Sequence, residues 1–121
     1  MIFKEERLRN EFWELVPKLR SILCRVEMIA KQHGEETVVT SLIRSQEEQK
    51  LLYDSGQAPS LSSVHMYGRG GDVRKFKSPA LNQVIVQTIL DEYPYGHLGK
   101  PSAMLHEGSA EHLHFQCWEM S

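Results

Sequence analysis

The sequence predicts a single α+β domain in which a small, mainly antiparallel sheet is flanked by helices. Apolar residues recur at three- and four-residue steps through the first 30 positions, which is the period of amphipathic helices. Residues 37–43 are rich in β-branched side chains, and two short strand-like segments lie near the C-terminus. The 121 residues, 40% hydrophobic and 25% charged, suit one core, so we expect one domain over residues 1–121.

The N-terminal segment, residues 1–36, is expected to be a helical scaffold. Pro17 has no amide hydrogen and tolerates only the first turn of a helix. A first helix should therefore end near Val16, and a second should begin at Pro17. Gly34 is the expected end of the second helix.

A strand over residues 37–43 and a short helix are expected next. Ser45 is a good helix N-cap, and Glu48 lies three positions later, which is the spacing of a capping box. Gly56 should end this helix. The Ser-, Pro- and Gly-containing stretch that follows, residues 55–63, has the composition of a loop.

The remaining elements are a strand, a helix and a hairpin. Residues 72–76, Asp-Val-Arg-Lys-Phe, alternate like a strand through their first three side chains, which predicts a strand. Ser78 and Pro79 can begin a helix that continues to about Tyr93, before a Pro-Tyr-Gly break at 94–96. Residues 103–106 and 112–118 should form two strands around a short hairpin loop.

Charge and hydropathy exclude several functional classes. The chain carries 14 basic and 16 acidic residues, a formal net charge of -2, so no basic surface for nucleic acid or anionic membrane is expected. No apolar run approaches the roughly 20 residues of a membrane span. The first residues are charged and lack the pattern of a secretory signal, which predicts a cytoplasmic protein as synthesised.

A metal site is predicted from His65, Asp72 and the His112-Leu113-His114 segment. Glycines at 68, 70 and 71 allow a tight turn, so His65 before it and Asp72 after it can converge. Side chains 112, 114 and 116 share one face of a strand. Two imidazoles and one carboxylate form the ligand set of a catalytic zinc ion that keeps a fourth position for water.

The segment Ser-x-His-x-x-Gly-x-Gly-x-Asp at 63–72 resembles the S-x-H-x-x-G-x-A-x-D signature of the D-Ala-D-Ala metallopeptidases. That family includes vancomycin-resistance dipeptidases, phage L-alanyl-D-glutamate endolysins and, more remotely, the zinc fold of hedgehog signalling domains. Ser63, His65, Gly68 and Asp72 match the signature, whereas Gly70 stands where the family usually has alanine. The resemblance implies a hedgehog/D,D-peptidase-like fold and zinc bound by His65 and Asp72.

Two further blocks extend the resemblance over residues 37–118. Glu111-His112-Leu113-His114 resembles the E-x-x-H element, which implies that His114 is the third zinc ligand and Glu111 the general base. Some branches carry H-x-H instead, so His112 is an alternative base. A strand already formed at 111 would turn Glu111 to the opposite face from His112 and His114 unless a bulge intervened.

The segment at 40–49 resembles a strand-to-helix element of the family whose arginine lies over the active site. Arg44 takes that position. The competing interpretation is a surface ion pair of Arg44 with Glu47 or Glu48, which would contribute little to stability.

Together these matches imply a zinc-dependent hydrolase acting on short peptides or peptidoglycan stem peptides of the cell wall. The expected reaction is cleavage of a D-Ala-D-Ala bond, by a carboxypeptidase or dipeptidase, or of an L-Ala-D-Glu bond, by an endolysin-type endopeptidase. Phage or prophage origin with release to the wall would suit the second case. Two alternatives remain: a zinc domain of this fold without peptidase activity, and a phage-associated wall-binding module. Oligomeric state is left open.

Overall fold

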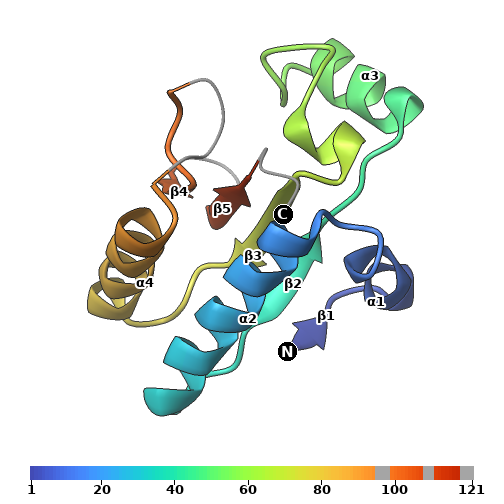
Figure 1. The fold of residues 1–121 in the computed structure, drawn as a ribbon. Helices are drawn as coiled ribbons and strands as arrows, with labels where there is room; N and C mark the ends of the chain where they lie inside the picture. Colours follow the sequence, from blue (N-terminus) through green and yellow to red (C-terminus); the bar gives the residue numbers. More distant parts are fainter. Residues whose placement is uncertain (95–98, 108–110, 118–121) are drawn as a thin grey trace.

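The computed structural model of the chain describes residues 1–94, 99–107 and 111–117. Within these residues, four α-helices and a 3-10 helix surround one five-stranded open sheet (Figure 1). The strands are β1 (Ile2–Phe3), β2 (Val38–Ser41), β3 (Gly70–Arg74), β4 (Ala103–His106) and β5 (His112–Gln116). The helices are α1 (Glu6–Phe12), α2 (Pro17–Gln32), α3 (Gln46–Asp54), η1 (Val64–Tyr67) and α4 (Pro79–Glu92), of which η1 is the 3-10 helix.

The sheet has the order β1-β2-β3-β5-β4 and is antiparallel except at one edge. The β2–β3, β3–β5 and β5–β4 pairs are antiparallel, whereas β1 runs parallel to β2. The predicted α+β class with a mainly antiparallel sheet is therefore confirmed. Strand β1 was not predicted, because its two residues, paired with Val38 and Val39, are too few to show a sequence period.

Local signals placed most helix boundaries correctly. Pro17 is the first residue of α2, and Pro79 is the first residue of α4. The Ser45 side chain accepts a hydrogen bond from the Glu48 amide, and the Glu48 side chain accepts one from the Ser45 amide, so the predicted capping box is formed. Helix α1 ends at Phe12 rather than near Val16, because the chain turns and the Val16 amide donates to the carbonyl of Gly68.

Strand β3 begins and ends two residues before the predicted segment 72–76. Gly70 and Gly71 already pair with Gln116 and Phe115 of β5. The strand then ends because the Phe76 amide donates to the Asn82 side chain instead of to a neighbouring strand. Tyr95, Gly96, Trp118 and most of the predicted hairpin loop lie outside the described residues.

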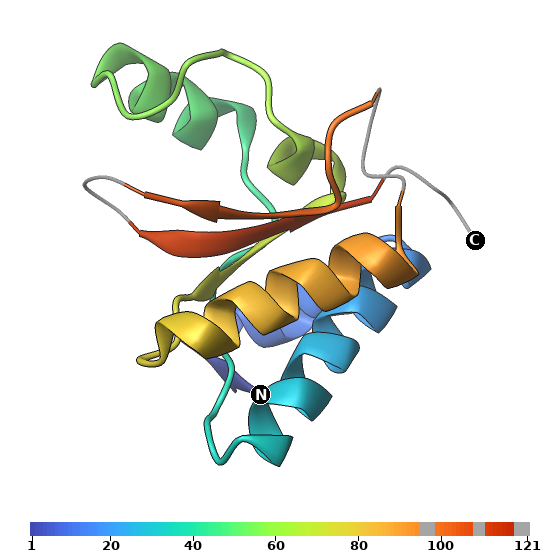
Figure 2. The same cartoon turned by 90° about the vertical axis from the view of Figure 1, so that its left-hand side faces the viewer.

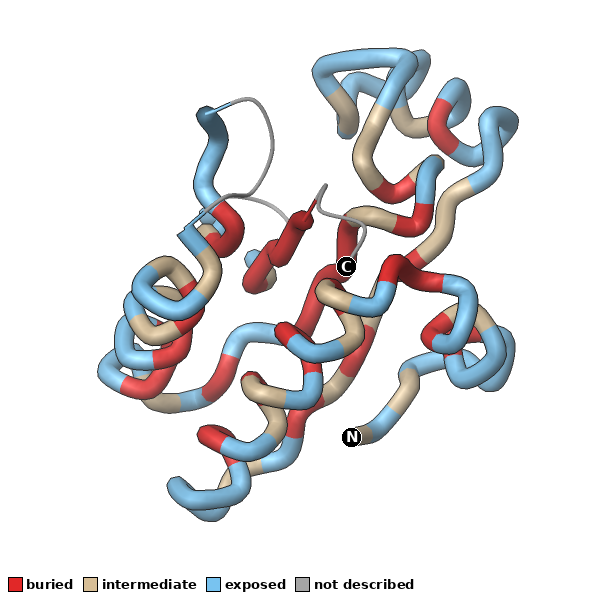
Figure 3. The backbone as a smooth tube through the Cα atoms, viewed as in Figure 1, coloured by how far each residue is buried: buried red, intermediate tan, exposed pale blue. Residues whose placement is uncertain are grey.

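The two faces of the sheet have different partners. Helices α2 and α4 cover one face, and α3 and η1 lie on the other (Figure 2). Buried residues concentrate on the central strands and on the sides of α2 and α4 that face them (Figure 3). On β5, Leu113 and Phe115 enter this apolar core, so alternation turns His112, His114 and Gln116 toward the α3 side.

None of the described helices combines the length and apolar character needed to cross a membrane.

Candidate metal centre

Three of the predicted site residues converge on the α3 side of the sheet. His65 lies on η1, Asp72 on β3 and His114 on β5, and Asp72 and His114 are directly paired across the two strands. All three side chains are buried, and one potential ligand atom from each lies within 4.8 Å of the others. Residues that are 49 positions apart at the extremes thus form one group that can hold a metal ion.

The turn before β3 sets the position of His65. The Ser63 side chain accepts a hydrogen bond from the His65 amide and caps η1. Gly68 ends η1 with a φ of 67°, in the left-handed region that favours glycine. A Cβ at this position would also lie 3.3 Å from the carbonyl oxygen of Glu14, so the chain could not approach the α1–α2 connection as closely.

The side chain of Val64 gives a reason for glycine rather than alanine at position 70. A Cβ at Gly70 would lie 2.6 Å from Cγ2 of Val64 and 3.2 Å from the amide nitrogen of His65. Valine has no flexible end that could move aside, so an alanine at 70 would displace η1. Glycine at this position therefore accommodates the β-branched Val64.

Gly70→Ala is expected to destabilise the protein by about 1 to 3 kcal/mol, the usual range for overpacking, and to weaken metal binding by shifting His65. Chemical unfolding and zinc titration measure the two effects. Val64→Ala combined with Gly70→Ala should recover both, because the clashing methyl groups are gone. Equal losses in the single and double variants would show that Val64 is not the reason for glycine.

Hydrogen bonding decides which nitrogen of His65 faces the site. Its Nδ1 lies 2.7 Å from the carbonyl oxygen of Leu42, which can only accept. Nδ1 must therefore carry the hydrogen, and the neutral ring presents the lone pair of Nε2. That atom lies 3.3 Å from Oδ2 of Asp72.

The same reasoning orients His114 through Gln116. The Gln116 amide donates from Nε2 to the carbonyl of Pro101, 2.9 Å away, so its Oε1 faces His114 Nε2 at 3.1 Å. Since Oε1 can only accept, the hydrogen of the neutral ring is on Nε2. The lone pair of Nδ1 then faces Oδ1 of Asp72 at 2.8 Å.

When both rings are neutral, this arrangement brings three electron-pair donors together without a hydrogen between them. Burial by itself would raise the pKa of the Asp72 carboxyl, but a proton on the rings supplies the charge of His65 and the hydrogen bonds from His114 and His65 that outweigh burial and hold that pKa below its ordinary value. The carboxylate is thus ionised, and it repels neutral imidazole lone pairs unless the rings gain protons or a cation binds between them. Partners that fix the outer ring nitrogens are typical of histidines that ligate metals. The residues present therefore fit a metal ion.

A cleft of about 700 Å³ opens over the three residues. Its wall includes Arg44, Lys100, His106, His112 and Gln116. The metal group thus lies at a surface that a ligand can reach, unlike a structural site closed on all sides.

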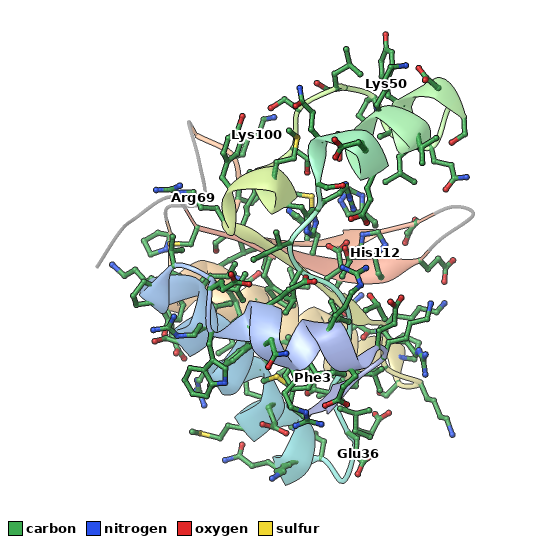
Figure 4. The ribbon with its side chains drawn as sticks, turned by 90° about the vertical axis from the view of Figure 1, so that its right-hand side faces the viewer. Phe3, Glu36, Lys50, Arg69, Lys100 and His112 are labelled. Atoms are coloured by element: carbon green, nitrogen blue, oxygen red, sulfur yellow. The ribbon has the colours of Figure 1, made fainter. Side chains whose placement is uncertain are left out.

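His112 lies beside the group, on the same face of β5 as His114. Its Nε2 is 3.6 Å from Oδ1 of Asp72, and its side chain is 26% exposed. Figure 4 shows His112 at the level of the sheet, below the layer that contains α3. The ring can therefore meet both the metal group and a molecule in the cleft.

Glu111 points elsewhere. Its carboxylate forms an ion pair with Lys75, and it is absent from the described residues that line the cleft. The β3–β5 register runs without a bulge to the Arg74–His112 pair, so no irregularity turns Glu111 toward Asp72. Of the two candidate bases, the structure brings His112 to the metal group and does not bring Glu111 there.

Arg44 lies on the cleft wall. Its backbone amide donates to the carbonyl of His65, and its Nη1 donates to Oε1 of Gln49 at 2.8 Å. Gln49 is buried and donates in turn to the carbonyl of Ser60, which fixes its amide. Within the described part of the chain, Arg44 forms no ion pair with Glu47 or Glu48, contrary to the alternative interpretation.

Comparison with known proteins does not assign the chain to a family. No protein-family model matches the chain, and no curated protein matches it. The assignment of a function therefore depends on the motifs and on the arrangement of these side chains.

Three polar residues of the site were not assigned a role from sequence. His106 stacks against His112 with ring centroids 4.8 Å apart and lies edge-on to His114 at 5.7 Å. Burial, and then the neighbouring charges of His112 and His114, lower the pKa of His106. Gln116 could have been found by extending the 112, 114 alternation one step, and Gln49 could have been found because it ends the 40–49 segment, five residues after Arg44.

Proposed function

We propose that this protein is a zinc-dependent peptidase of the D-Ala-D-Ala metallopeptidase type, with a hedgehog/D,D-peptidase-like fold, that hydrolyses peptidoglycan stem peptides. The observation that carries the proposal is the convergence of two imidazole lone pairs and one carboxylate oxygen at the base of an open cleft. Each histidine is held by a hydrogen bond on its outer nitrogen.

Zinc is the metal that this donor set suits best. Two histidine nitrogens and one carboxylate oxygen are a common set for catalytic zinc, whereas magnesium and calcium prefer oxygen ligands throughout. The opening of the cleft above His65, Asp72 and His114 leaves room for a further ligand. When bound, zinc supplies an acidified water, with a pKa of about 7, and polarises a carbonyl group.

The other side chains of the site have different roles, according to where they lie. His112 takes the proton of the attacking water as general base and returns it to the leaving amine. Arg44, held by Gln49, donates to the carbonyl oxygen as negative charge develops on it. Glu111 remains the second candidate base, because the E-x-x-H resemblance implies that role.

Digestion of purified peptidoglycan and synthetic stem peptides by the zinc-loaded protein tests the proposal. Mass analysis of the fragments should show hydrolysis of one peptide bond, either D-Ala-D-Ala or L-Ala-D-Glu. Chelation or Asp72→Ala should abolish the products. Zinc bound at about one per chain without any hydrolysis would favour the non-enzymatic zinc domain, and retention on intact peptidoglycan without cleavage would favour the wall-binding module.

A further inference from the structure

The charges along the cleft differ from those of the whole chain. The protein has a formal net charge of -2. Among the described residues that line the cleft, however, Arg44 and Lys100 are cationic and Asp72 is the one acidic side chain. Asp72 belongs to the metal group, so its charge is opposed by any ion bound there. The cleft is therefore positive with a divalent ion bound, in a protein that is negative overall.

Lys100 is the cationic residue of the cleft that has no role in the proposed mechanism. It is exposed, and it lies on the cleft wall before β4, at the level of the layer that contains α3 (Figure 4). Lys50 and Lys75 pair with Asp54 and Glu111, whereas Lys100 has no carboxylate within ion-pair distance among the described residues. In the part of the chain that the structure describes, no carboxylate therefore competes with a molecule in the cleft for this ammonium group.

We propose that Lys100 is the specificity-determining residue that binds the free carboxylate close to the scissile bond of the substrate. This inference rests on the proposed function and assigns the residue that recognises that carboxylate. The ammonium group of a lysine is a compact charge on a flexible side chain, so it can reach a carboxylate at a variable distance from the reacting carbonyl. The rigid guanidinium fork of an arginine would fix that distance more tightly. The Arg44 side chain is instead held by Gln49, and the proposed mechanism assigns it to the carbonyl oxygen.

The test uses two matched pairs of peptides that differ by one carboxylate. The first pair is N-acetyl-D-Ala-D-Ala and its C-terminal amide, and the second is a stem tripeptide containing D-glutamate and its D-isoglutamine counterpart. Calorimetry on the zinc-loaded protein gives Kd without requiring turnover, and KM replaces Kd for a peptide that is hydrolysed. Wild type should prefer the acid of at least one pair by about 3- to 10-fold, the scale of a partly exposed charged contact.

Lys100→Met should remove this preference and leave the binding of the amide unchanged, and Lys100→Arg should retain it. Lys50→Met is the matched control, since it removes the same charge from α3 away from the lining of the cleft. An equal preference in wild type and Lys100→Met, or its equal loss in Lys50→Met, would overturn the proposal. Selective binding of the acid without hydrolysis would support the role of Lys100 but refute the proposed peptidase activity. Failure of the Lys100 proposal and failure of the proposed function are therefore distinguishable.

Discussion

Replacing His65, Asp72 or His114 by alanine is expected to abolish stoichiometric zinc binding, whereas the wild-type protein should bind about one zinc ion per chain. Each residue contributes one of the three converging atoms, and the remaining pair cannot hold the ion against water. Removing a residue that only hydrogen-bonds to a ligand usually lowers metal affinity by roughly 10- to 100-fold. We expect the loss of a ligand itself to lower zinc affinity by more than this. Metal analysis after mild chelation, with competitive titration, measures the change.

Asp72→Asn separates metal loss from misfolding. It keeps the shape of the side chain while removing the charge that the cation offsets, so zinc should be lost from a folded protein. Circular dichroism confirms the fold. Asp54→Asn is the matched control, because Asp54 is exposed and pairs with Lys50 away from the cleft. Retention of zinc in all of the ligand variants would place the metal elsewhere.

His112→Ala is expected to lower the rate of peptide hydrolysis by about 10² to 10⁴ while zinc remains bound. The ring lies beside Asp72 on the cleft side of β5, where it can take a proton from water. Glu111→Gln should stay within about threefold, because it removes only an exposed ion pair with Lys75. Steady-state kinetics with zinc analysis on the same samples gives both quantities.

The opposite effects of the His112 and Glu111 variants would also identify the base. An inactive Glu111→Gln that keeps its zinc, beside an active His112→Ala, would return the base to Glu111 and place the site with the E-x-x-H enzymes. Lys75→Met is the control for that outcome. It breaks the same ion pair but leaves the Glu111 carboxylate, so an effect shared by both variants would come from the ion pair rather than from catalysis.

Several elements were determined by the sequence alone, because their causes lie within a few residues. Pro17 and Pro79 begin helices since neither has an amide hydrogen to lose, and the Ser45–Glu48 capping box closes within one turn. The candidate metal group was also predicted from the sequence. His65 and Asp72 are joined by a short glycine-rich turn, and the resemblance of residues 111–114 to the E-x-x-H element implied His114, so the three residues that converge were named before the distances were known.

Other features depended on contacts between distant segments. Strand β1 exists because Ile2 and Phe3 pair with β2, which no local period indicates. The role of Glu111 depended on whether β5 begins with a bulge, and its regular register directs that side chain to Lys75 instead. The outer partner of His65, the carbonyl of Leu42, likewise comes from a segment that is distant in the sequence.

The sequence therefore determined which residues could bind a metal, and the tertiary structure decided which others surround it. Residue types and short spacings specify ligand chemistry, since a carboxylate and two imidazoles suit zinc wherever they meet. The side of the sheet on which Arg44, Lys100 and His112 gather is a property of strand register and of the packing of α3 and η1. A shift of one residue in β5 would place Leu113 on the cleft side and turn His112 and His114 into the apolar core.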